Sequence, residues 1–159
     1  MRTETTRRTR RIGAAATCAA AAAAIGLPIL GAGDAAAAPT SNCSFTFANP
    51  NLTVLRGYAN VFINDVGGDR ARVTVISNPQ TLFGYHQQAN LTWANLDTGR
   101  TGSAALAPVR VVGQDAEFTF PTLRTGPGRI AFVVGLSNDR GITGITSTNG
   151  DCSVEHRVG

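Results

Sequence analysis

The chain has 159 residues, of which 43% are hydrophobic and 15% are charged, and its formal net charge is +4. Five arginines within the first eleven residues produce most of this excess, because nine Arg oppose eight acidic residues after position 38, which leaves +1. A nucleic-acid-binding protein is expected to have a basic surface, so the composition excludes nucleic acid from the expected partners.

The first 37 residues have the layout of a secretory signal peptide. Residues 1–11 are basic, residues 12–33 are uncharged and mostly small or apolar, and alanines precede the predicted cleavage after Ala37. The alternative is a retained membrane anchor, because the apolar run is close to the roughly 20 residues that a span needs. Its alanine-rich composition, its glycines and Pro28 favour cleavage. The predicted domains are therefore a signal peptide at 1–37 and one secreted domain at 38–159, with no stable membrane span after cleavage.

Cysteine and arginine usage indicates the compartment and the source. All basic residues are Arg, which together with the many Ala and Gly residues is typical of a GC-rich bacterial genome. Both the general secretory route and the twin-arginine route stay open for export. Cys18 leaves with the leader, so Cys43 and Cys152 remain for an oxidising compartment. Their predicted disulfide closes a loop of roughly 110 residues and contributes on the order of 4–5 kcal/mol.

The mature chain is patterned for β-strands. Apolar residues alternate with polar residues in segments 43–47, 72–75, 90–93 and 116–120, which indicates strands with one solvated face. Segment 129–136 is apolar on both faces, which predicts a central strand. Turn residues separate these segments: Gly99 is expected in the left-handed conformation, and Asn149–Gly150 is expected as a tight turn. The sequence predicts an all-β fold, an antiparallel β-sandwich of the immunoglobulin-like class with seven to nine strands and one terminal disulfide.

Three residues, Tyr85, His86 and Trp93, are candidates for a binding surface. Tyr85 and His86 belong to the polar segment 85–88, which breaks the alternation and is expected as a loop or an edge strand. The alternative is an exposed edge without a ligand. Trp93 shares a face with Leu91 and is expected in the core, whereas a different register would make its ring a platform for a sugar.

The chain offers weak signals for a metal and for catalysis. Asp65 and Asp69 lie in a glycine-rich loop of the kind that binds calcium, but the same residues are common in turns. We therefore expect no metal and no cofactor. His86 and His156 are the two histidines, and no catalytic set can be assembled around either from spacing alone.

These observations predict an exported, non-enzymatic protein that binds an envelope or extracellular partner, such as a cell-envelope polysaccharide or an extracellular protein. One alternative is a secreted inhibitor or structural protein that acts through the segment 124–129, which is expected as an exposed loop. A second alternative is a small secreted hydrolase that uses His86 or His156.

Overall fold

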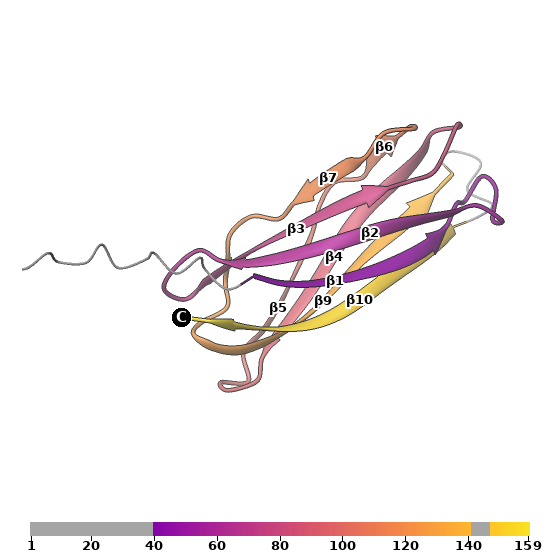
Figure 1. Cartoon of the computed structure of the whole chain (residues 1–159). Coiled ribbons are helices and arrows are strands. Elements are labelled where there is room, and N and C mark those ends of the chain that lie inside the picture. The colour runs from indigo at the N-terminus through magenta and orange to yellow at the C-terminus, as the bar shows by residue number, and fades with distance from the viewer. Residues whose placement is uncertain (1–39, 141–146) are drawn as a thin grey trace, which may run out of the picture. The chain divides into compact units, whose positions relative to one another are not determined.

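The computed structural model describes residues 40–140 and 147–159, and every regular element in these ranges is a β-strand. The predicted leader at 1–37, with Cys18, lies outside the described residues. Two antiparallel sheets pack face to face (Figure 1), which confirms the predicted β-sandwich. No helix that could cross a membrane occurs in the part of the chain that the structure describes.

Sheet A has the strand order β1-β2-β3-β7, and β8 also pairs with β3. Its strands are β1 (Thr40–Ala48), β2 (Arg56–Asp65), β3 (Arg70–Asn78), β7 (Ala116–Thr119) and β8 (Leu123–Arg124). The hairpin between β2 and β3 turns at Gly67 and Gly68, whose φ angles are 93° and 70°. These positive angles explain the two consecutive glycines, because other residues rarely adopt them.

Sheet B has the strand order β10-β9-β4-β5, and β6 also pairs with β4. Its strands are β4 (Tyr85–Asn95), β5 (Thr101–Ala105), β6 (Val109–Val111), β9 (Gly128–Asp139) and β10 (Ser147–Val158). The predicted central strand at 129–136 lies within β9, between β10 and β4. The described ranges hold ten strands rather than seven to nine, because prolines separate the short strands β6 and β8 from longer neighbours.

The core lies between the two sheets and follows the predicted alternation. Val73, Val75 and Phe118 of sheet A are buried, whereas Arg72 and Glu117 beside them are exposed. Sheet B contributes a matching inner face, with Leu91, Ile130, Phe132, Val134 and Leu136. Burial of these large apolar side chains is the main favourable contribution to folding.

The edge strands β1 and β10 are joined along one side of the sandwich. A disulfide connects Cys43 with Cys152 across a Cα–Cα distance of 6.2 Å and a sequence separation of 109 residues, which confirms the predicted bridge. Farther along the same strands, the Thr148 hydroxyl donates a 2.5 Å hydrogen bond to the carbonyl oxygen of Ala48. The bridge fits maturation in an oxidising compartment.

The two turn predictions have opposite outcomes. Gly99 lies between β4 and β5 with φ of 75°, as expected. The prediction of a turn at Asn149–Gly150 is wrong, because both residues lie inside β10. A Cβ atom on Gly150 would lie 2.7 Å from Cδ2 of Phe45, so this glycine is explained by close packing of β10 against β1.

Candidate functional site

The outer face of sheet B carries two parallel rows of polar side chains. Strand register places the members of each row on neighbouring strands, with a spacing of about 4.8 Å from strand to strand. The first row comprises Arg110, His86, Asp139 and Ser147, and the second row comprises Gln88, Ser137 and Asn149. We call these seven residues the polar rows.

Six of the seven residues of the polar rows line a hollow with a volume of about 680 Å³. Its lining comprises His86, Gln88, Pro108, Ser137, Asn138, Asp139, Ser147 and Asn149. Amide, hydroxyl, carboxylate and imidazole groups therefore meet on one open surface. Such groups supply both hydrogen-bond donors and acceptors to a ligand.

Some of these groups are already oriented by neighbouring residues. The Gln88 amide donates to the carbonyl oxygen of Leu106 at 3.0 Å. The Asn90 amide donates to the Ser137 hydroxyl at 3.2 Å. These contacts fix the side chains before any ligand binds, which lowers the entropic cost of binding.

The prediction that segment 85–88 is a loop or an edge strand is wrong. The segment opens β4, which pairs with β9 on one side and with β5 and β6 on the other. The alternation continues through it, because Tyr85 and Gln87 point into the core while His86 is exposed. The side-chain amide of buried Gln87 donates a 2.7 Å hydrogen bond to Oδ1 of Asn138, whereas its Oε1 atom has no partner among the described residues.

Tyr85 is buried, so its ring does not belong to a binding surface. Its hydroxyl lies 3.4 Å from the carbonyl oxygen of Pro79, to which it donates. Burial raises the pKa of Tyr85 far above its ordinary value, because the phenolate would lose its hydration. Of the three predicted binding residues, His86 is the one that the structure places in the hollow.

Trp93 lies on the inner side of sheet B, next to the core, as expected from its alternation with Leu91. Its ring covers Gly102, which is its partner on β5. A Cβ atom on Gly102 would lie 2.6 Å from the indole. The ring therefore fills space at the open edge of the sandwich and does not lie flat on the outer face.

The polar rows do not form a serine-hydrolase triad. In a triad, the histidine lies between the serine and the aspartate. Here the strand order places Asp139 between His86 and Ser147, which keeps the serine and the histidine two strand spacings apart. Within the described residues, His86 forms no hydrogen bond with a serine hydroxyl.

The second histidine is paired with a serine but is enclosed. Nδ1 of His156 lies 2.9 Å from the Ser41 hydroxyl across the β1–β10 edge. His156 is 3% exposed, and its Nε2 atom has no hydrogen-bond partner among the described residues. Burial lowers the pKa of His156, and the charge of Asp65 offsets part of this effect. A triad needs a carboxylate on the far nitrogen, which the described residues do not provide here.

The two calcium candidates, Asp65 and Asp69, form hydrogen bonds at the hairpin between β2 and β3. The Asp65 carboxylate accepts hydrogen bonds from the backbone of Gly67 at 2.7 Å and of Gly159 at 3.0 Å. These two bonds lower the pKa of Asp65. Asp69 contributes its backbone carbonyl, which accepts from the amide of Gly126. In the described ranges, no group of three or more acidic, histidine or cysteine residues has the arrangement of a metal site.

The segment 124–129 is not the projecting loop that the sequence predicts. Thr125 and Gly126 are buried. The side-chain amide of Asn95 donates to the carbonyl oxygens of Thr125 at 3.1 Å and of Pro127 at 3.0 Å. The segment is therefore fixed to the β4–β5 connection, and its middle is not free to enter a partner's cleft.

Sequence reasoning singled out His86 but missed its neighbours Gln88, Ser137 and Asn149. The signal for Asn149 was present, since Ser147, Asn149, Asp151 and Ser153 alternate along one strand face. The predicted turn at Asn149–Gly150 obscured this pattern. Comparison with protein-family models, with curated proteins and with solved structures found no match to this chain.

Proposed function

We propose that this protein is an exported, non-enzymatic β-sandwich of bacterial type and of the immunoglobulin-like class, which binds a cell-envelope polysaccharide through the polar rows. The observation that carries the proposal is the hollow of about 680 Å³ beside His86, whose lining residues are all polar except Pro108. The leader-like N-terminus and the disulfide support export.

The spacing of the polar rows favours an extended, polyhydroxylated ligand. A polysaccharide chain that lies across the strands would meet a new hydrogen-bonding side chain about every 4.8 Å. Each sugar carries several hydroxyl groups, and each can both donate and accept. Gln88, Asn149 and Ser137 complement such a ligand because amide and hydroxyl groups also do both.

The ligand would be held by hydrogen bonds rather than by ring stacking. The outer positions of β4 and β9 in the hollow are His86, Gln88, Ser137 and Asp139. Trp93, which could stack on a sugar, faces inward. Hydrogen bonds exchanged with water contribute only about 1 kcal/mol each, so we expect weak binding per sugar and strong binding only to long chains.

The test is co-sedimentation of the exported protein with insoluble polysaccharide fractions of bacterial cell envelopes. We expect retention on one fraction, with affinity reduced about fivefold or more by His86→Ala and by Asn149→Ala. Thr46→Ala is the matched control, because Thr46 is an exposed residue on the outer face of sheet A. Absence of retention on every fraction, or equal losses in all three variants, would overturn the proposal.

A further inference from the structure

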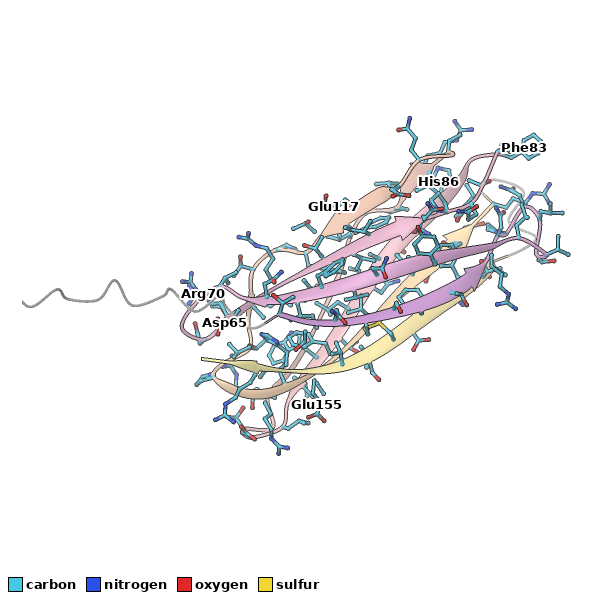
Figure 2. All side chains as sticks on the ribbon, viewed as in Figure 1. Asp65, Arg70, Phe83, His86, Glu117 and Glu155 are labelled. Atoms are coloured by element: carbon cyan, nitrogen blue, oxygen red, sulfur yellow. A yellow bond between two sulfur atoms is a disulfide. The ribbon has the colours of Figure 1, made fainter. Side chains whose placement is uncertain are left out.

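One end of the sandwich presents exposed apolar side chains on two neighbouring loops. Loop 49–55 joins β1 to β2, and loop 79–84 joins β3 to β4. The side chains of Leu82, Phe83 and Val54 are 88%, 75% and 80% exposed, and Leu52 is also exposed. We call these four residues the apolar tip. Figure 2 shows Phe83 at the end of the strands opposite Asp65.

The two loops are held together by hydrogen bonds. The Asn51 amide donates to the carbonyl oxygen of Phe83 at 2.7 Å, and the Asn49 amide donates to the carbonyl oxygen of Gln80 at 3.1 Å. Leu55 and Leu82, one from each loop, line the same hollow of about 340 Å³. The apolar tip is therefore a single surface built from both loops.

The backbone of this end is fixed in a costly conformation. Gln80 has φ of 43°, in the left-handed region that residues other than glycine rarely adopt. Asn78 stabilises it, because its Oδ1 accepts hydrogen bonds from the Gln80 backbone and side-chain amides. The Thr81 hydroxyl donates to the carbonyl oxygen of Phe83. Leu82 and Phe83 are thus held away from the core, and strain of this kind is concentrated at functional surfaces.

Exposed arginines flank the apolar tip. Arg56 directly follows loop 49–55, and the guanidinium of Arg110 lies against Gly84, next to Phe83. Neither arginine forms an ion pair with an acidic side chain in the described ranges. Asp115, which lies outside the two tip loops, accepts a hydrogen bond from Asn78 at 2.7 Å. The tip thus combines protruding apolar groups with unpaired positive charge.

We propose that the apolar tip inserts into the surface of a membrane that contains anionic lipids. Side chains that protrude singly from loops need no shape-complementary pocket in a lipid layer, whereas a protein partner would have to provide one for each. Lipid acyl chains would bury the four apolar side chains, and anionic headgroups would attract Arg56 and Arg110. The four residues of the apolar tip lie outside the polar rows, with which this surface shares Arg110, so the proposal goes beyond polysaccharide binding.

The test is flotation of the protein with lipid vesicles made of equal parts phosphatidylcholine and phosphatidylglycerol, compared with phosphatidylcholine alone. All variants carry the same N-terminus, so any contribution of the leader cancels. We expect binding to the anionic vesicles that weakens with added salt. The double variant Leu82→Ser/Phe83→Ser should reduce it about tenfold or more, from lost apolar burial.

Leu96→Ser is the matched control, because Leu96 is an exposed leucine in the β4–β5 connection. It should bind as the unaltered protein does, and thermal melts should show that all variants are folded. No flotation, equal loss in the Leu96 variant, or capture of a protein through Leu82 and Phe83 without vesicle binding would overturn the proposal. Retention on polysaccharide is measured separately, so failure of the membrane proposal can be distinguished from failure of the polysaccharide proposal.

Discussion

Asn49 and Asn95 form the same pattern of hydrogen bonds in two different loops of the sandwich. Each is 1% exposed. Oδ1 of Asn95 accepts from the backbone amides of Asp97 and Thr98, both at 3.0 Å, and Oδ1 of Asn49 accepts from those of Asn51 and Leu52. Each side-chain amide then donates to the carbonyl oxygen of a second loop. Both residues close a turn and tie it to a neighbour.

Replacing Asn95 should therefore destabilise the fold. Asn95→Ala removes two hydrogen bonds within its turn and two to the segment 125–127. We expect a loss of about 2–4 kcal/mol in the free energy of unfolding, because buried backbone groups lose their partners. Urea denaturation measures it. Thr98→Ala changes an exposed neighbour and should cost less than about 0.5 kcal/mol; equal losses would contradict this account.

Removing the disulfide should cost stability without changing the fold. The double variant Cys43→Ser/Cys152→Ser releases a crosslink that spans 109 residues. We expect the free energy of unfolding to fall by about 2–5 kcal/mol, mainly because the unfolded chain gains freedom. Chemical denaturation of oxidised protein and of the variant provides the comparison. Unchanged stability would show that the other β1–β10 contacts suffice.

His156 should make stability depend on pH. Burial lowers the pKa of His156 in the folded protein, so the unfolded chain binds a proton at a higher pH than the folded chain does. Neutral His156 contributes its full stabilisation above the ordinary histidine pKa of about 6.5. This stabilisation is lost as the pH falls from there through the lower pKa of His156 in the folded protein. In that window the free energy of unfolding should fall by up to about 1.4 kcal/mol per pH unit.

Urea midpoints measured between about pH 7 and pH 5 test this dependence. His156→Gln should flatten the curve, and an equally steep curve for this variant would contradict the account. Asp65 faces the same ring, but its lowered pKa affects stability only in more acidic solution.

The emission wavelength of Trp93 should report its close packing against Gly102, because Trp93 is the single tryptophan in the sequence. Gly102→Ala places a Cβ atom 2.6 Å from the ring, so the indole must move outward. We expect a red-shifted emission and a destabilisation of about 1–3 kcal/mol. Ser103→Ala, the exposed neighbour on β5, should change neither. Unaltered emission from the Gly102 variant would mean that the ring does not cover this glycine.

Local pattern predicted the faces of the strands well, because alternation depends only on neighbours in sequence. The alternation in segments 72–75 and 116–120 predicts that Val73, Val75 and Phe118 lie on the unsolvated face, where the structure has them. The burial of Gln87 was not predicted, because its partner Asn138 is 51 residues away. The turn prediction at Gly150 is wrong for a similar reason. The Phe45 ring, which leaves no space for a side chain at this glycine, belongs to a strand that is distant in sequence.

The candidate site was only partly predictable. His86 was singled out for its residue type, whereas Ser137 and Asn149 join it through the register of β4, β9 and β10. Strand register is set by turns and by core packing together. Neither the strand order nor the register was available from a single sequence, so the two polar rows could not be assembled before the fold was known.

The most direct test of the proposed binding surface is a residue-by-residue map of ligand contact. Backbone amide resonances of the exported protein would be followed by NMR during addition of soluble fragments of the retained polysaccharide. We predict that the largest shifts fall on His86, Gln88, Ser137 and Asn149, while Thr46 and Arg72 on sheet A do not move. Shifts concentrated on sheet A, or no shifts at saturating fragment, would contradict the assignment of the binding surface to sheet B.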